Sequence, residues 1–184
     1  MQVHTISAKA KSAAKVPELT ICKAQALGLT GSEAEAIRLL KSCMLSAAID
    51  DIKPLVLLGH IYLKTGKLAD AASAYESALR KAPSGCPLDV YIRLGTSYLD
   101  TGKVEDAAAV FGQACIARPC ASAWLGAGKA YLRLLDLGNA DLCFTEANVL
   151  DSENAMIWGY LALVQLLAER DSEADQVRSC CTCG

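Results

Sequence analysis

This sequence has little excess charge, little histidine and no long apolar run. A net charge of −2 with 18 basic residues gives no electrostatic footprint for nucleic acid. The longest apolar stretch, Trp158 to Ala168, is too short to span a bilayer, and no secretory leader is visible. We therefore expect partners other than nucleic acid or membrane.

The motifs of catalysis are missing as well. The 2 histidines are His4, close to the first residue, and His60, next to Gly59. There is no glycine-rich phosphate loop and no nucleophile motif. Acidic residues such as Asp50 and Asp51 fall at predicted helix ends, where carboxylates usually act as caps. We expect no enzyme, no cofactor and no small-molecule substrate.

The 9 cysteines do not form a metal-binding pattern. Four of them stand at helical positions that suit a small apolar side chain, so we interpret them as core residues. The last three crowd the C-terminal end without a histidine or a second pair at zinc spacing. We expect no metal site and a reducing compartment. The core set is Cys22, Cys43, Cys115 and Cys143, and the terminal set is Cys180, Cys181 and Cys183.

One residue pattern occurs three times. Each copy is centred on a glycine, and the three glycines are spaced by 36 and 33 residues. A large side chain precedes each glycine, and a tyrosine, an alanine, a second ring and another alanine follow at fixed intervals. The copies are Leu55, Gly59, Tyr62, Ala71, Tyr75 and Ala78; Tyr91, Gly95, Tyr98, Ala107, Phe111 and Ala114; and Trp124, Gly128, Tyr131, Ala140, Phe144 and Ala147.

Each copy reads as two amphipathic helices, because apolar residues recur three and four apart on both sides of a break. The breaks fall at Thr65-Gly66-Lys67 and Thr101-Gly102-Lys103. Glycine weakens a helix, so Gly59, Gly95 and Gly128 are expected where a partner helix comes too close for a side chain. The rings should fill the space between hairpins, which makes stacking obligatory.

The pattern resembles the tetratricopeptide repeat. The resemblance implies an all-α superhelix of helical hairpins, a solenoid of about four to five repeats. A weaker copy contains Ala24, Ala36, Leu40 and Cys43, and a last copy begins at Trp158 but carries Arg178 where a ring should stand. The expected domains are a leader over 1–16, a degenerate first repeat over 17–51, repeats over 52–87, 88–120 and 121–154, and an incomplete repeat with a cysteine-rich end over 155–184.

Two interpretations of the leader stay open. The first seventeen residues hold three lysines and no acid, which fits either an organellar transit peptide or a loose segment that is expected to be disordered.

The resemblance also implies a partner-binding groove lined by the first helix of each hairpin. A leucine recurs at one groove position and predicts an apolar stripe, suited to an amphipathic helix or an extended apolar peptide, or to another part of the same polypeptide. The groove residues are Lys53, Val56, His60, Leu63, Ile92, Thr96, Leu99, Leu125, Lys129, Leu132 and Leu166. The same positions also carry Lys64, Asp89, Asp100, Ser122 and Arg133.

A co-chaperone role is disfavoured. Repeat proteins that hold the acidic C-terminus of a chaperone carry lysine and asparagine at fixed groove positions, because a terminal carboxylate requires basic and amide donors. In this sequence those positions hold Val56, His60, Arg93, Ser122 and Gly126.

Longer runs of sequence are similar to the C-terminal repeats of the cilia- and flagella-associated protein 70 family. The similarity covers roughly residues 50–170 and is carried by LGHIYLKTGK (58–67), VYIRLGTSYL (90–99), ARPCASAWLGAGKAYLRL (117–134) and ENAMIWGYLALVQLL (153–167). It implies a structural protein of the motile ciliary axoneme, in a central-apparatus or dynein-associated projection, whose repeats bind other axonemal proteins. A soluble peptide-binding adaptor in the cytoplasm or an organelle is the alternative.

Overall fold

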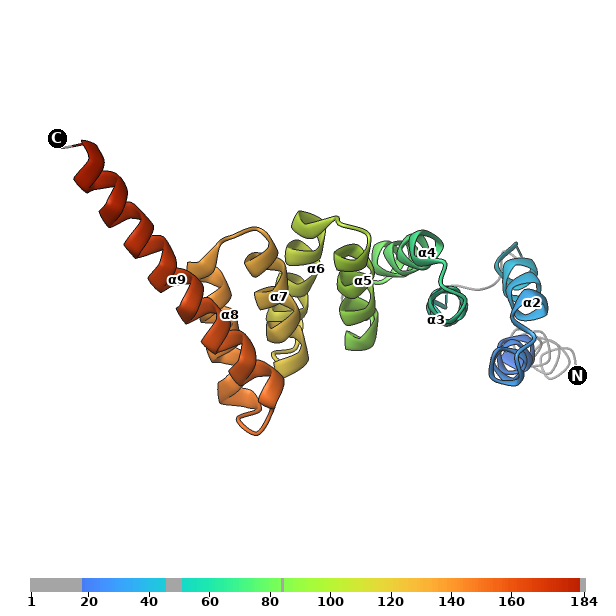
Figure 1. Cartoon of the computed structure of the whole chain (residues 1–184). Coiled ribbons are helices and arrows are strands. Elements are labelled where there is room, and N and C mark those ends of the chain that lie inside the picture. The colour runs from blue at the N-terminus through green and yellow to red at the C-terminus, as the bar shows by residue number, and fades with distance from the viewer. Residues whose placement is uncertain (1–17, 46–50, 84, 183–184) are drawn as a thin grey trace, which may run out of the picture. The chain divides into compact units, whose positions relative to one another are not determined.

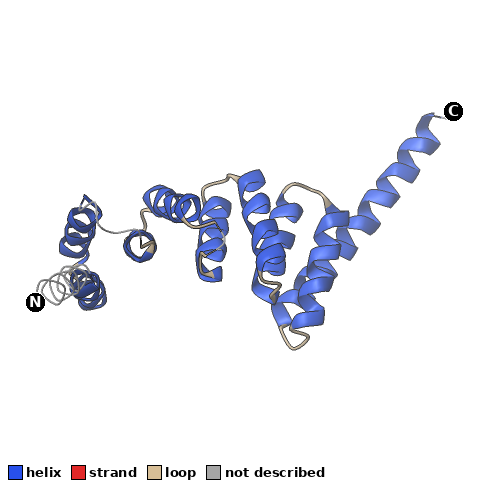
Figure 2. Cartoon of the chain, turned by 180° about the vertical axis from the view of Figure 1, so that it is seen from behind, coloured by secondary structure: helices blue, strands red, loops and turns tan. Residues whose placement is uncertain are grey.

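The computed structural model describes residues 18–45, 51–83 and 85–182, with side chains described as far as residue 170. The expectations for the leader and for the C-terminal cysteines therefore lie outside the described side chains. Throughout the described part the secondary structure is helical, without a strand (Figure 2). This agrees with the predicted all-α class.

The chain divides into two units, residues 1–86 and 87–184, and each is described by itself. Within each unit the helices follow one another as antiparallel hairpins (Figure 1). The first unit contains a helix over 18–30, α2 (Glu33–Leu45), α3 (Lys53–Lys64) and α4 (Leu68–Lys81). The second contains α5 (Leu88–Asp100), α6 (Val104–Ala117), α7 (Ala121–Arg133), α8 (Leu137–Leu150) and α9 (Ala155–Thr182).

The three repeat glycines pack against rings, as the sequence predicts. A Cβ added at Gly59 would lie 2.6 Å from Tyr75 Cζ, and one added at Gly95 would lie 2.6 Å from Phe111 Cζ. At Gly128 the added atom would lie 2.5 Å from Phe144 Cε1. Carbon atoms do not approach so closely, so these positions exclude every side chain. The three rings are at most 1% exposed and form the centre of the core in their hairpins.

Each hairpin turns through a residue with positive φ. Gly31 has φ 89°, Gly66 has φ 73° and Gly102 has φ 79°, and Leu135 takes the same place between α7 and α8 with φ 60°. In all four turns the N–H of the next residue donates to a carbonyl group five residues earlier, as Lys103 does to Tyr98 at 2.9 Å. This bond closes the first helix of the hairpin. Leu135 therefore adopts a conformation that favours glycine.

The last element is one helix and not a hairpin. Helix α9 runs without interruption from Ala155 to Thr182, through the position where earlier repeats turn. Its first half packs on α8, where Tyr160 stacks on Phe144 at 5.0 Å between ring centroids with 9° between the planes. Val164 is 2% exposed and joins Ala140 and Phe144 in one buried cluster. The incomplete last copy in the sequence thus corresponds to a single helix.

The substitution Gly95→Ala tests the contact between glycine and ring. We expect it to lower the free energy of unfolding by roughly 1–3 kcal/mol, because the added methyl group overlaps Phe111. Gly112→Ala on α6 is the matched control: nothing lies within 4 Å of its added Cβ. Because alanine favours helix, the control should gain up to about 1 kcal/mol. Urea denaturation measures both, and equal midpoints would contradict the packing described here.

The substitution Leu135→Gly tests the strained turn. Leu135 is 80% exposed, so little apolar burial is lost, and glycine relieves a backbone cost of about 1–2 kcal/mol. We expect a net gain of about 1 kcal/mol, and a loss of similar size for Gly102→Leu, its counterpart in the preceding hairpin. Thermal unfolding monitored by circular dichroism measures both changes; destabilisation by Leu135→Gly would refute the interpretation.

Candidate functional site

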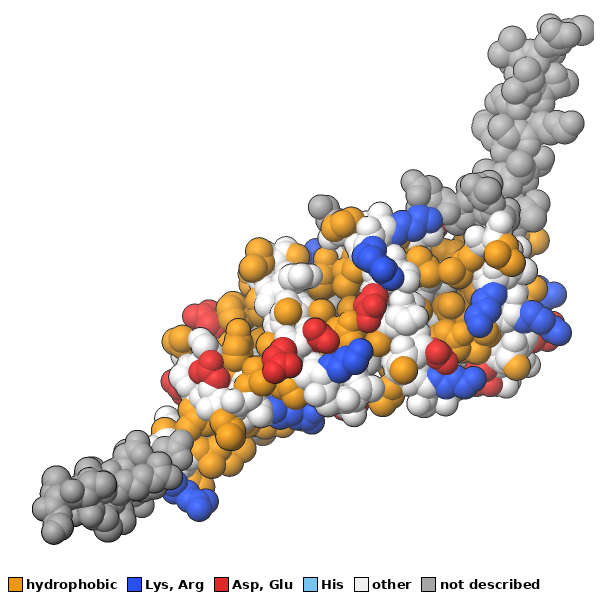
Figure 3. All heavy atoms as spheres, turned by 90° about the horizontal axis from the view of Figure 1, so that it is seen from above, with side chains coloured by type: hydrophobic (Ala, Val, Ile, Leu, Met, Phe, Trp, Pro, Cys, Tyr) orange, Lys and Arg blue, Asp and Glu red, His pale blue; other side chains and the backbone are white. Residues whose placement is uncertain are grey.

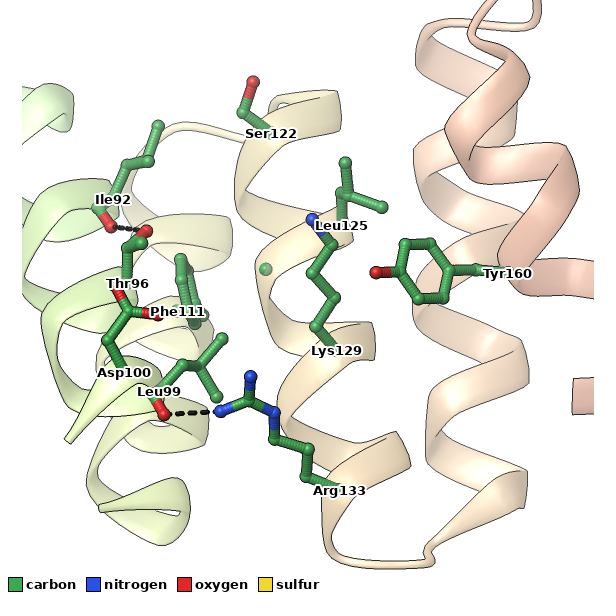
Figure 4. Close-up of a pocket in the computed structure, with 11 residues that line it drawn as sticks. Ile92, Thr96, Leu99, Asp100, Phe111, Ser122, Leu125, Lys129, Arg133 and Tyr160 are labelled. Carbon is green, nitrogen blue, oxygen red and sulfur yellow. Dashed lines mark hydrogen bonds between the residues drawn. The ribbon is translucent and has the colours of Figure 1, made fainter. Parts of the chain in front are cut away.

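The second unit contains a cavity of about 320 Å³ between the first helices of neighbouring repeats. Helices α5 and α7 supply most of its wall, and α6 and α9 close it (Figure 4). Five residues of the main predicted groove set meet here, namely Ile92, Thr96, Leu99, Leu125 and Lys129. Asp100, Ser122 and Arg133, which the sequence places at the same groove positions, line the cavity as well.

One part of the wall is apolar. Ile92 on α5 and Leu125 on α7 are half-buried; Leu125 also packs toward the cluster of α8 and α9, and the Phe111 ring lies between α5 and α7 (Figure 4). Gly126 also lines the cavity, and a Cβ there would overlap Phe111. The ring therefore has glycine on both sides, Gly95 on α5 and Gly126 on α7. This double contact holds the two walls close together.

The other part of the wall carries charge. Lys129 is half-buried, its Nζ lies 5.2 Å from the centroid of the Tyr160 ring, and it reaches Met156 Sδ at 3.5 Å. Burial, together with the nearby Arg133 guanidinium, lowers the pKa of Lys129 below its usual range. Arg133, one turn later on α7, donates from Nη1 to the carbonyl oxygen of Leu99. Two cations from successive turns of α7 thus line the cavity.

Hydroxyl groups and one carboxylate complete the lining. Thr96 donates its Oγ1 hydrogen to the carbonyl oxygen of Ile92 at 2.7 Å, which leaves its oxygen able to accept. Ser122 lies in the first turn of α7, and Asp100 at the end of α5 is exposed. The lining therefore contains donors and acceptors beside an apolar wall, a combination typical of sites that bind peptides or small ligands.

The predicted apolar stripe is less open than the sequence indicates. Leu99 lines the cavity but is only 6% exposed. Arg133 donates a hydrogen bond to its carbonyl oxygen, and α7 packs beside it. Leu132 packs against the buried cluster of α8 and α9, and Leu63 is half-buried. Leu166 is 55% exposed on α9. Of the stripe, only Leu166 presents most of its surface.

The groove residues of the first unit are less concentrated. His60 is half-buried and lines a second cavity of about 190 Å³, with its ring centroid 5.8 Å from that of Tyr75. Lys64 closes this cavity by bonding to the carbonyl oxygen of Gly28 at 2.7 Å and to Glu33 Oε1 at 3.0 Å. Lys53 pairs with Asp51 at 3.4 Å, and Val56 is half-buried. Neither of these two lines the cavity.

Three residues of the larger cavity stand outside both groups of predicted groove residues. Phe111 belongs to the second helix of its hairpin, Gly126 has no side chain to offer a partner, and Tyr160 belongs to the next repeat. A signal existed for Tyr160, because it lies near Trp158 at the start of the last copy. Only the register between α9 and α7 reveals that its ring reaches Lys129.

The described cysteines match the interpretation as core residues in three of four cases. Cys43, Cys115 and Cys143 are buried, whereas Cys22 is exposed. Burial raises the pKa of the Cys115 thiol from 9.0 to about 12, with smaller contributions from Cys143 and Cys120, and that of Cys143 to about 11. These thiols stay protonated at neutral pH and are poor nucleophiles and ligands.

Two other features are absent from the described part of the chain. No three of their His, Cys, Asp or Glu side chains come together where a metal ion could bind. Among the described helices none is long and apolar enough to cross a membrane. On the face shown in Figure 3, basic and acidic side chains are interspersed among apolar ones.

Helical hairpins held by rings against glycines, with a cavity between their first helices, define a repeat domain of the tetratricopeptide class. Domains of this class present extended surfaces that bind other proteins. Residues 4–183 match the family described as the Cilia and flagella-associated protein 70 C-terminal domain. The chain belongs to this family.

Relatives and solved structures agree with this membership. The chain is 37% identical over 134 residues to Cilia- and flagella-associated protein 70 of Homo sapiens, covering 71% of this chain and 12% of the human protein. A Macaca fascicularis protein of the same name is 47% identical over 64 residues, which are 35% of this chain and 6% of that protein. The chain thus spans a small part of these relatives.

Two similar solved structures show the fold alone. A crystal structure of the MamA protein has a TM-score of 0.78 at 16% identity, covering 89% of this chain and 88% of that one. MamA from Desulfovibrio magneticus RS-1 has a TM-score of 0.74 at 22% identity, covering 87% and 89%. The predicted tetratricopeptide fold is confirmed.

The raised thiol pKa values predict how stability depends on pH. The unfolded chain loses the Cys115 proton near pH 9, whereas the folded chain keeps it to about 12. The folded state then binds more protons, so the stabilisation is complete below about pH 9 and is lost as pH rises toward 12. At pH 10.5 the titration of this thiol alone should lower the free energy of unfolding by about 2 kcal/mol.

Urea midpoints at pH 8 and pH 10.5 measure this loss. The variant Cys115→Ala should lose less stability between the two pH values than the parent, although it starts lower because a buried atom is missing. Cys22→Ala, at an exposed cysteine, should lose as much as the parent. An unchanged loss in Cys115→Ala would show that the buried thiol does not titrate as described.

Proposed function

We propose that this domain is a non-catalytic docking scaffold and that it binds other proteins through the first helices of its hairpins. Membership of the cilia- and flagella-associated family is the observation that carries the proposal. The cavity between α5 and α7 supports it, since its lining offers apolar contact and hydrogen bonds but no paired acid and base or activated nucleophile. No cofactor is required for this role.

We place the protein in the motile ciliary axoneme, as a structural component of a central-apparatus or dynein-associated projection. The two relatives carry names that associate them with cilia and flagella. The packed hairpins within each unit suit such a role, because they present fixed surfaces and lose little entropy on binding. Neighbouring axonemal proteins would be the partners, without nucleic acid or membrane.

A soluble adaptor is the second candidate. Helices α5, α6, α7 and α9 line the larger cavity, and its volume lies near the lower end of the range for ligand pockets. Such a cavity suits a free peptide as well as a protein of the axoneme. Such an adaptor would bind its peptide in the cytoplasm or in an organelle. On cell fractionation it would be found in the soluble fraction.

Fractionation separates the two candidates. A tagged copy of the protein is expressed in a flagellated cell, the membrane is removed with detergent, and the axoneme is washed with moderate salt. Retention in the axoneme is expected if the domain is built into a projection. Complete release into the soluble fraction would contradict the axonemal proposal and favour the adaptor.

A surface variant tests the face that binds. Thr96 is exposed and lines the cavity, so Thr96→Glu obstructs it without disturbing the core. Gln113→Glu, exposed on the second helix α6, is the matched control of equal charge change. We expect Thr96→Glu to reduce axonemal retention severalfold and the control to leave it unchanged. Equal retention of both variants would exclude this face.

A further inference from the structure

The two cations of the larger cavity lack an acidic partner among the described residues. The interactions of Lys129 are with the Tyr160 ring and the Met156 thioether, and Arg133 donates to a backbone carbonyl group. Neither forms an ion pair with Asp100, although that carboxylate also lines the cavity. The half-buried ammonium group of Lys129 has exchanged part of its hydration for contacts with a ring and a thioether, which are weaker than an ion pair. The site therefore favours an incoming anion.

The geometry also limits where that anion would bind. Lys129 and Arg133 are one turn apart on α7, and Figure 4 shows Lys129 extending toward Leu125 and Tyr160 and Arg133 extending toward Leu99. The bond to Leu99 engages the Arg133 guanidinium group, whereas the Lys129 ammonium group has three N–H donors and no oxygen acceptor among the described residues. The ammonium group is therefore the donor best placed to bind an incoming carboxylate. The net charge of this lining is positive, because Asp100 offsets only one of the two cations.

The rest of the lining determines which partner groups can lie next to the anion. Leu125 is half-buried beside Lys129 (Figure 4), and half-buried Ile92 lines the same cavity from α5, so a partner side chain that covers Leu125 would bury more apolar surface. The Thr96 oxygen can accept a hydrogen bond from a partner backbone N–H. A cavity of about 320 Å³ holds one or two side chains and not a large cofactor.

We propose that the cavity between α5 and α7 binds an acidic side chain of a partner peptide, with its carboxylate on Lys129 and an adjacent apolar residue against Leu125. This inference rests on the proposed function and specifies the chemistry of its partner. It differs from the carboxylate-binding arrangement considered above, because Ser122 and Gly126 stand at two of those positions and the cations stand elsewhere.

The occupant is an internal acidic residue and not a chain terminus. A terminal carboxylate is usually held by several basic or amide groups or by a nest of backbone N–H groups. Here one of the two cations is already engaged with Leu99, and a carboxylate lies in the same lining. A side-chain carboxylate with an apolar neighbour matches both parts of the wall at once.

Selection from a displayed library of random twelve-residue peptides tests the proposal directly. The intact chain is the bait, and Lys129→Met, which keeps the length of the side chain and removes its charge, is the variant. Lys67→Met, at an exposed lysine of the α3–α4 turn, is the control. We expect the enriched peptides to share Asp or Glu next to an apolar residue, and we expect the variant to bind them at least roughly tenfold more weakly than the control.

Single changes in the best enriched peptide sharpen the result. Replacing its acidic residue by the amide should weaken binding to the parent chain but not to Lys129→Met, as a shared interaction requires. Amidating the peptide C-terminus should change nothing, and a requirement for the free terminus would overturn the choice of a side chain. Circular dichroism confirms that both chain variants remain folded.

Two outcomes would overturn the inference in different ways. Enriched peptides that lack acidic residues, or that bind Lys129→Met and the control equally, would refute the acidic anchor while leaving peptide binding intact. A selection without any enrichment over an empty support would count against peptide binding itself and so against the proposed docking face.

Discussion

The structure depends on the contact between an aromatic ring and a glycine on the neighbouring helix. Phe111 shows it most clearly, since Gly95 on α5 and Gly126 on α7 leave no room for a side chain on either side of the ring. The ring is 1% exposed, so the contact lies inside the core. It brings two helix backbones close to one flat group and so sets the spacing of α5 and α7. The site follows from that spacing, because these helices form the walls of the cavity.

Much of this packing could be predicted from residue spacing. A glycine within a helical pattern, followed at a constant interval by a ring, predicts a close approach of two helices, and the structure places Gly59, Gly95 and Gly128 against such rings. The turns at Gly66 and Gly102 follow from the same pattern. Five of the predicted groove residues line one cavity, since positions repeated at the helical period lie on one face.

The remaining features depend on packing that spacing does not encode. Gly126 contacts the ring of the preceding repeat, a relation invisible within its own copy. Leu99 occupies a groove position, yet Arg133 covers its backbone and it is buried. Leu135 shows that this turn geometry does not require glycine, because the surrounding hydrogen bonds impose positive φ on a leucine. The ring of Tyr160 reaches Lys129 only because α9 packs beside α7 and α8.

The central claim is that the first-helix face of these repeats binds protein neighbours. A photoactivated crosslinking residue placed at Thr96 reports contacts from that face, and one placed at Gln113 reports contacts from the second helix; both positions are exposed. The measurement is the yield of crosslinked partner in isolated axonemes, read by mass spectrometry. The account predicts a defined partner from position 96 and little from position 113. Partner captured from position 113 alone would show that the repeats bind through the opposite helices.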